Sequence, residues 1–250
     1  MPKLVRHIAA MTAVMCLAAC GNRRDEIQDY GADGFYERGT DAMEAHNYAG
    51  AANYFLQLSA RYPFSNEARQ AQLDLIYVYY KSNQPDAAID AAEQFERENP
   101  THARVDYCLY MKALVYFDKA PNILEKLFRI DMTLRPPKDT LLAFSTFQDL
   151  IRRYPDSRYV EDARQRMVWL RNRLATYENH VAAYYIDRGA FVAAINRGKY
   201  ALEHYPGAPE LEETLMLMIT AYRELGMQDL ADDSVRVLRE NFGDEAVAKL

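Results

Sequence analysis

A helical segment that stops at an aromatic–proline pair recurs along the chain and constrains its fold more than any other feature. Residues 49–63 read AGAANYFLQLSARYP, and four later segments end in a similar way. A proline disfavours helical geometry in the residue before it, so each such pair ends a helix. Aromatic–proline pairs close three segments, at Tyr62-Pro63, Tyr154-Pro155 and Tyr205-Pro206, whereas Asn99-Pro100 closes the second and Phe242-Gly243 the last. Self-similarity at a period of about 20–50 residues is typical of a repeat protein.

Small side chains keep a fixed distance from each closing residue. Twelve positions before it stand five alanines: Ala51, Ala88, Ala143, Ala194 and Ala231. A small side chain lets two helices approach closely, so we expect each alanine to lie between the two helices of a hairpin. The partner position on the first helix holds Gly39, Ile76, Ala113, Ala182 and Ile219. Seventeen positions before the closing residue, where the hairpin must turn, stand His46, Asn83, Lys138, Gly189 and Gly226.

This register predicts an all-α fold, an α-solenoid of five helical hairpins that resembles the tetratricopeptide repeat over residues 32–243. The closing residues lie 37, 55, 51 and 37 positions apart, so two intervals are long. The third repeat is 18 residues longer than the regular interval, and the extra residues fall roughly within 118–137. The fourth has an extended first helix of about 30 residues, because no proline or glycine interrupts residues 157–188.

The N-terminus has the composition of a lipoprotein signal. Lys3 and Arg6 precede an uncharged run of 12 residues at 8–19, too short to span a bilayer as a helix. Leu17-Ala18-Ala19-Cys20 resembles the bacterial lipoprotein cleavage box, and the alternative is an ordinary secretory peptide with a chance cysteine. We therefore expect residues 1–19 to be a signal peptide and 20–31 to be a lipidated cysteine with its tether. The repeat domain then occupies 32–250, and Gly21 resembles an outer-membrane address.

Net charge and cysteine content argue against a nucleic-acid-binding protein and against a disulfide-bonded fold. The net charge is −6, and removing Lys3 and Arg6 with the signal changes it to −8. Such an acidic protein is a poor candidate for binding nucleic acid. After cleavage and acylation, Cys108 is the one thiol left, so no intrachain disulfide can form. Its apolar helical surroundings predict a small buried side chain.

Catalytic and metal-binding motifs are missing from the sequence. It has no Gly-x-Ser-x-Gly, His-Glu-x-x-His, Cys-x-x-Cys or phosphate-binding glycine loop. His46, His102, His180 and His204 lie in different repeats without ligand spacing. We therefore predict no enzyme activity, no metal and no cofactor apart from the covalent N-acyl and S-diacylglycerol lipid on Cys20.

Tyrosines dominate the candidate binding residues. In tetratricopeptide folds the first helix of each hairpin lines the concave face, and tyrosine combines contact area with a hydroxyl that suits an extended peptide. This mapping gives a candidate peptide site of nine residues: Tyr36, Thr40, Asp74, Tyr77, Tyr80, Lys81, Tyr107, Tyr110 and Met111. The alternative is that several of them pack adjacent helices together.

A basic cluster in the fourth repeat is the second candidate surface. Arg188, Asn196, Arg197 and Lys199 project from the turn and second helix of an otherwise acidic protein. The cluster is either a solvated face or a surface that meets an acidic partner.

The chain resembles the BamD (ComL) family of outer-membrane assembly lipoproteins over nearly its whole mature length. The resemblance is carried by Arg61-Tyr62-Pro63-Phe64, Gln72-Leu73-Asp74-Leu75-Ile76-Tyr77, Asn99-Pro100-Thr101-His102, Asp106-Tyr107, Arg173-Leu174-Ala175, Arg188-Gly189-Ala190-Phe191-Val192-Ala193 and Asn196-Arg197. It implies a scaffold anchored by lipid to the outer membrane and facing the periplasm.

The resemblance also implies partners. Its C-terminal repeats would dock on the POTRA modules of BamA through Tyr184, Arg188, Asn196 and Arg197. Its N-terminal repeats would receive the C-terminal segments of unfolded outer membrane proteins, and the lipoproteins BamC and BamE are further implied partners. An alternative function on the same fold is a periplasmic adaptor for envelope maintenance that contacts peptidoglycan. A third is an unrecognised enzyme on a helical scaffold.

Overall fold

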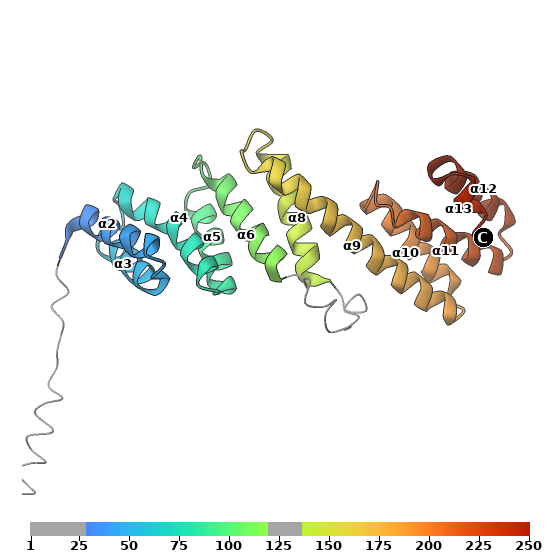
Figure 1. Cartoon of the computed structure of the whole chain (residues 1–250), viewed down its shortest axis with the longest axis horizontal. Coiled ribbons are helices and arrows are strands. Elements are labelled where there is room, and N and C mark those ends of the chain that lie inside the picture. Colours follow the sequence, from blue (N-terminus) through green and yellow to red (C-terminus); the bar gives the residue numbers. More distant parts are fainter. Residues whose placement is uncertain (1–28, 120–136) are drawn as a thin grey trace, which may run out of the picture.

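A row of antiparallel helical hairpins forms the body of the protein in the computed structural model, which describes residues 29–119 and 137–250 (Figure 1). Within these two ranges no residue forms a strand, and the predicted all-α solenoid of five hairpins is confirmed. The helices are α2 (Gly31–Glu44), α3 (Tyr48–Arg61), α4 (Asn66–Lys81), α5 (Pro85–Glu98), α6 (Val105–Lys119), α8 (Lys138–Arg153), α9 (Val160–Asp187), α10 (Phe191–His204), α11 (Leu211–Glu224), α12 (Gln228–Phe242) and the short α13 (Asp244–Val247). The signal peptide, Cys20, most of the tether and most of the insertion lie outside the described residues.

The small residues of the repeat register form the contacts inside the hairpins. All five alanines predicted at the close approach are at most 1% exposed. Four of the five turn residues adopt positive φ angles of 57–71°, namely His46, Asn83, Gly189 and Gly226. Lys138 differs because the insertion separates α6 from α8, so this residue begins α8 instead of forming a turn.

Side-chain caps start some of the helices. The Asn47 side chain accepts a hydrogen bond from the Gly50 amide at 3.0 Å, and Ser65 Oγ accepts one from the Ala68 amide at 2.9 Å. These bonds satisfy amides that have no partner within the helix. Pro85 begins α5, where a missing amide hydrogen has no cost.

The long helix α9 joins the two halves of the stack. It has 28 residues, close to the predicted 30. Ala163 and Leu170 pack in a core formed with α4, α5, α6 and α8, whereas Leu174 and Ala182 pack in cores formed with α10, α11 and α12. In Figure 1, α9 runs diagonally from the third hairpin to the last ones. One continuous helix therefore belongs to both hydrophobic cores.

Two further properties of the described helices concern the thiol of Cys108 and the apolar character of the helices themselves. Cys108 is 2% exposed, as predicted, and burial raises the pKa of its thiol to about 12, so it stays protonated. None of the helices in residues 29–119 and 137–250 combines the length and the apolar character needed to cross a membrane.

Replacing Gly39 with alanine is expected to lower the free energy of unfolding by about 1–3 kcal/mol, because the added Cβ would overlap the ring of buried Phe55. Gly198→Ala tests a second close approach, because its Cβ would overlap Cγ of Met218, a core side chain that is 5% exposed. We expect a loss there as well, reduced only as far as the unbranched Met218 side chain can repack. Urea unfolding followed by circular dichroism measures both, and a Gly39 variant as stable as the wild type would contradict the close-approach argument.

Candidate peptide-binding face and docking surface

Hydrogen bonds from tyrosine to aspartate connect the first helices of successive hairpins. Tyr36 Oη on α2 donates to Asp74 Oδ2 on α4 at 2.9 Å, and Tyr80 Oη on α4 donates to Asp118 Oδ2 on α6 at 2.5 Å. In both pairs the partners are 38 residues apart, one more than the regular repeat interval. We call the surface formed by α2, α4, α6 and α9 the first-helix face.

The third bond of this kind reaches the long helix. Tyr110 Oη on α6 donates to Asp162 Oδ2 on α9 at 2.9 Å, and the Tyr110 ring stacks on Tyr159 with centroids 4.4 Å apart. Arg166 Nε donates to the same Asp162 oxygen at 2.6 Å. Burial opposes the charged form of Asp162, but the bonds from Arg166 and Tyr110 outweigh it and lower the pKa of this carboxyl group.

Burial also fixes the protonation of the tyrosines. Together with the adjacent carboxylates, it raises the pKa of Tyr36, Tyr80 and Tyr110 to about 12. Their hydroxyls are therefore proton donors at neutral pH. Burial raises the pKa of Asp74, and the hydrogen bonds from Tyr36 and from Gln70 Nε2, the latter at 3.1 Å, counteract this effect.

The remaining predicted peptide-site residues differ in how much surface they offer. Thr40 Oγ1 donates to the Tyr36 carbonyl oxygen at 3.0 Å. Tyr107 and Tyr77 are half-buried, and burial raises the pKa of Tyr107. Lys81 is exposed, with Nζ 5.6 Å from the centre of the Tyr77 ring.

Met111 is the exception among the nine. It is 4% exposed and packs in the core of the second and third hairpins, so it offers almost no surface to a ligand. The two interpretations of the tyrosines are therefore compatible. The hydroxyls of Tyr36, Tyr80 and Tyr110 connect the helices, while the partly exposed rings and Lys81 remain as surface.

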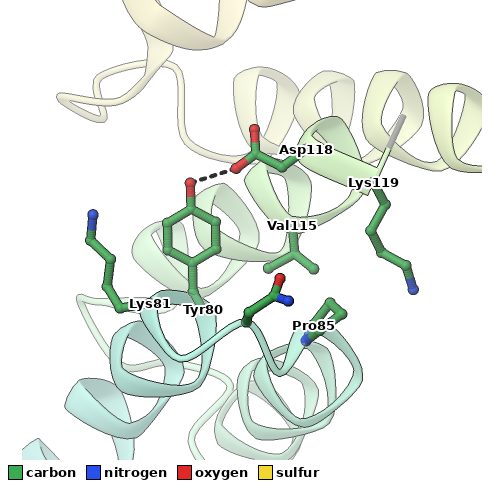
Figure 2. Close-up of a pocket in the computed structure, with 7 residues that line it drawn as sticks. Tyr80, Lys81, Pro85, Val115, Asp118 and Lys119 are labelled. Carbon is green, nitrogen blue, oxygen red and sulfur yellow. Dashed lines mark hydrogen bonds between the residues drawn. The ribbon is translucent and has the colours of Figure 1, made fainter. Parts of the chain in front are cut away.

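A hollow of about 320 Å³ lies where α4, α5 and α6 meet, beside the Tyr80–Asp118 bond. Pro85 and Val115 give it apolar walls, and Figure 2 shows the Lys81 and Lys119 side chains pointing away on opposite sides of it. Lys119 Nζ forms an ion pair with Asp86 at 2.9 Å, whereas Lys81 has no carboxylate partner within the described ranges. The hollow could accept a side chain, but its residues do not form a catalytic arrangement.

The predicted docking residues flank the turn between α9 and α10. Tyr184 is 52% exposed, and the Arg188 guanidinium lies 4.4 Å from the centre of its ring. Asn196 is exposed on α10. These three side chains are available to a partner.

Arg197 has a structural partner that the sequence did not indicate. Its Nη1 lies 3.2 Å from Oε2 of Glu178, which is only 5% exposed. Burial raises the pKa of Glu178, and the positive charge of Arg197 offsets part of this effect. Removing Arg197 would leave a buried carboxylate unpaired, which is costly.

Exposed apolar side chains next to the last two turns were missed by sequence reasoning. Val192 is 60% exposed, and the second turn is flanked by Leu225, Met227 and Leu230 at 37%, 47% and 45%. Their exposure could have been inferred from their position beside the turn residues Gly189 and Gly226, because apolar side chains are unusual next to a helix turn. With Tyr184 and Arg188, they place exposed side chains beside the turns of both the fourth and the fifth hairpin.

Metal binding has no support in the described part of the chain. Within residues 29–119 and 137–250, no three histidine, cysteine, aspartate or glutamate side chains are placed to hold a metal ion.

The chain is similar to known proteins over most of its length. Residues 28–238 match the YfiO family, which is described as an outer membrane lipoprotein. A protein of Neisseria meningitidis serogroup A named outer membrane protein assembly factor BamD is 40% identical over 215 residues, which cover 86% of this chain and 80% of that protein. The chain belongs to the BamD family. A BamD-family relative from Vibrio cholerae with the same name is 34% identical over 234 residues, covering 94% of this chain and 97% of the relative.

Solved structures give looser similarities to this BamD-family chain. A crystal structure of MamA protein has a TM-score of 0.35 and 16% identity, covering 87% of this chain and 94% of that one. TPR-like repeats of a Podosopora anserina kinesin light chain have a TM-score of 0.37 and 11% identity, covering 85% and 96%. We therefore base the fold on the helices themselves.

Replacing Tyr36 with phenylalanine is expected to lower the free energy of unfolding by about 1–3 kcal/mol at neutral pH, because Asp74 loses a hydrogen bond. The Tyr36 hydroxyl stabilises charged Asp74, so the variant raises the pKa of this carboxyl group further. The loss is thus fully present above that pKa and shrinks as acid protonates the carboxylate. Urea unfolding at neutral and acidic pH measures it.

Tyr79→Phe is the matched control for this experiment. The Tyr79 hydroxyl has no hydrogen-bond partner among the residues that the structure describes, so we expect its removal to be nearly neutral at both pH values. Equal losses in the two variants would show that the Tyr36–Asp74 bond does not stabilise the stack.

Proposed function

We propose that this BamD-family chain is a non-enzymatic lipoprotein scaffold of the machinery that inserts β-barrel proteins into the outer membrane. The observation that carries the proposal is its 40% identity, over 86% of the chain, to a protein named outer membrane protein assembly factor BamD. The solenoid is consistent with this role, because helical repeats present extended surfaces on which partners bind.

The anchor in this proposal is the acylated Cys20. Two acyl chains already hold a protein stably on a membrane, and the expected third chain adds about 0.8 kcal/mol per buried methylene. The ten residues between Cys20 and Gly31, the first residue of α2, can reach at most about 35 Å when fully extended. The N-terminal hairpin therefore stays near the membrane, on the periplasmic side.

The first-helix face is the proposed receptor for substrate. Half-buried tyrosine rings, exposed Lys81 and the hollow beside Tyr80 suit an extended segment, and we propose that this is the C-terminal segment of an unfolded outer membrane protein. The hydroxyls of Tyr36, Tyr80 and Tyr110 are already fixed by aspartates, so the surface is formed before the ligand arrives. A preformed site loses less conformational entropy on binding.

The turns of the fourth and fifth hairpins are the proposed docking surface for the POTRA modules of BamA. Exposed Tyr184, Arg188 and Asn196 combine with the apolar side chain of Val192, a composition typical of interfaces. BamC and BamE are further proposed partners. A periplasmic adaptor that contacts peptidoglycan is the alternative, and in that case a POTRA-containing barrel protein would be absent after mild detergent extraction and co-purification.

Replacing Tyr184 and Arg188 together with alanine is expected to weaken capture of BamA by about tenfold or more, because interface tyrosine and arginine residues often contribute more than about 1.4 kcal/mol each. Pull-down of BamA from detergent extracts, followed by titration with its purified POTRA region, measures the effect. The control is Tyr30→Ala with Arg38→Ala, which removes a similar pair in the first hairpin, where the guanidinium lies 3.9 Å from the ring centre.

Unchanged capture by the Tyr184 and Arg188 variant would contradict the docking assignment. Arg197 needs a separate design because Arg197→Glu would place a second carboxylate beside buried Glu178 and could disrupt the hairpin itself. Arg197→Gln combined with Glu178→Gln removes both charges. If this variant keeps its thermal stability but no longer captures BamA in the pull-down, Arg197 contacts the partner directly.

Replacing Tyr77 and Lys81 together with alanine is expected to lower the affinity for a C-terminal peptide of an outer membrane protein by about tenfold, because neither side chain forms a bond between hairpins. Fluorescence anisotropy with a labelled peptide measures this. Leu56→Ala, an exposed position on the second-helix surface, is the control and should bind like the wild type. Equal affinities in all three proteins would remove the first-helix face as the receptor.

A further inference from the structure

A phenylalanine side chain stands almost entirely in solvent in the loop that joins the first hairpin to the second. Phe64 is 95% exposed, whereas the next most exposed large apolar side chain in residues 29–119 and 137–250 is Val192 at 60%. Phenylalanine is among the residue types most often fully buried, so a ring without any cover is unusual. We call residues 62–65 the first closing loop.

The other four hairpins carry small or polar residues at the same place in the repeat. The position after the closing residue holds Thr101, Asp156, Gly207 and Asp244, and all four are exposed. Such residues are the ones that turns facing water favour. The repeat architecture therefore does not require an apolar side chain at this position, and the hairpin that follows the tether is the one that has it.

The first closing loop presents Phe64 in a fixed direction. The Ser65 amide donates to the Tyr62 carbonyl oxygen at 3.0 Å, and Ser65 Oγ accepts from the Ala68 amide at the start of α4. The Tyr62 amide donates to the Leu58 carbonyl oxygen at 2.8 Å, so the loop is bonded to both helices that it joins. A ring held on such a loop loses little conformational entropy when it binds.

The tether leaves the fold beside the same loop. Tyr62 Oη donates to Asp29 Oδ1 at 2.6 Å, and the Gly31 amide donates to the same oxygen at 3.1 Å. These two bonds lower the pKa of the Asp29 carboxyl group, so it is charged and keeps the contact at neutral pH. Asp29 is nine positions after Cys20, a distance of at most about 32 Å along an extended chain. The expected lipid and the ring of Phe64 therefore belong to the same end of the solenoid.

Two exposed arginines flank the first closing loop. The Arg61 guanidinium lies 5.2 Å from the centre of the Phe35 ring, and Arg69 Nη1 donates to Asn66 Oδ1 at 3.3 Å. A guanidinium has five donors, so both arginines can also bond to lipid phosphates. Helix α2 contains four acidic residues and one arginine, a net charge of −3, so attraction to anionic lipid is not the main term. Contact with a bilayer at this end depends on the apolar ring.

We propose that Phe64 inserts into the interfacial region of the phospholipid bilayer that holds the acylated Cys20, so that the first hairpin rests on the membrane at two points. The inference rests on the proposed lipid anchor. Because the acyl chains keep the loop within reach of the bilayer, insertion is an intramolecular step with an effective concentration on the order of millimolar. A contact too weak to bind a membrane by itself is populated under this condition. The driving force is the removal of the ring from water.

Insertion of Phe64 restricts the tilt of the solenoid on the membrane. A tether alone leaves the stack free to rotate about its attachment, whereas two contacts on one hairpin favour one orientation. The first hairpin and the last two hairpins lie at opposite ends of the molecule (Figure 1). Since α9 packs in the cores of both halves, the orientation of the first hairpin also sets that of the proposed docking surface.

The experiment uses the full lipidated chain reconstituted into phosphatidylcholine vesicles that contain doxyl-labelled lipid. Asn66→Cys provides an exposed thiol two residues from Phe64, and this thiol is labelled with the fluorophore NBD. Cys108 stays unlabelled because its thiol is buried and protonated. We expect the doxyl lipid to quench the label at position 66. The same label on Arg158→Cys, three positions after the closing residue of the third hairpin, is the control and should keep its emission.

Variants of the ring itself locate the effect. Phe64→Ser gives the first closing loop the polar character of the other hairpins, and it is expected to lower the equilibrium constant for insertion by about tenfold. Quenching at position 66 then falls toward the level at position 158, whereas Phe64→Leu retains most of it. Leu56→Ser removes another exposed apolar side chain of the first hairpin and should leave the quenching unchanged. Circular dichroism verifies that each variant is folded.

Three results would overturn the inference. Equal quenching at positions 66 and 158, or unchanged quenching in Phe64→Ser, would exclude the ring as the membrane contact. A label at position 66 that responds only when the purified POTRA region or a peptide is added would assign Phe64 to a protein partner instead. Vesicle flotation separates this inference from the anchor on which it rests. A chain that floats without quenching at position 66 keeps the anchor and lacks the contact, whereas a chain that does not float has neither.

Discussion

The unbroken helix α9 is the element on which the rest of the structure depends. Its 28 residues correspond to about 42 Å of length, and it is packed in the hydrophobic cores of both halves of the solenoid. Asp162 near its start holds Tyr110 of the first-helix face, and Tyr184 near its end lies on the docking surface. Because α9 is one continuous helix, the two proposed binding surfaces at its ends keep a fixed separation.

Buried polar contacts hold the second half of α9 in register. The Thr214 hydroxyl on α11 donates to Asn179 Oδ1 at 2.6 Å, and Asn179 Nδ2 donates to the Glu210 carbonyl oxygen at 2.9 Å. Glu178, next to Asn179, pairs with Arg197 of α10. Buried polar groups tolerate little displacement because an unsatisfied partner costs about 1–3 kcal/mol. These contacts orient α10 and α11 on α9, and with them the turns that carry the docking residues.

The two surfaces use aromatic residues in different ways. On the first-helix face, hydroxyls are consumed by aspartates of the next hairpin, so tyrosines stabilise the stack and still expose part of their rings. In the last turn of α9, Tyr184 is more than half exposed and has a cationic neighbour, Arg188, instead of a carboxylate. The first arrangement favours a preformed face for a ligand, and the second favours a contact made by individual side chains.

The sequence by itself determined the hairpins, because alanines, turn residues and closing prolines in register act locally, within one helix or between the two helices of one hairpin. It also determined α9, since a helix without proline or glycine between residues 160 and 187 has no reason to break. Contacts between successive hairpins were decided by the tertiary structure. The twist of the stack sets which side chains of neighbouring hairpins meet, and the sequence contains no repeating pattern that reports this twist. For this reason the sequence could not predict three contacts: the hydrogen bond of Tyr36 with Asp74 at an offset of 38 residues, the ion pair of Arg197 with Glu178, and the ring contact of Phe117 with Trp169.

The sequence analysis placed Met111 on the surface, whereas the structure buries it in the core. Met111 follows Tyr110 by one residue, and one residue corresponds to a rotation of about 100° around the helix axis.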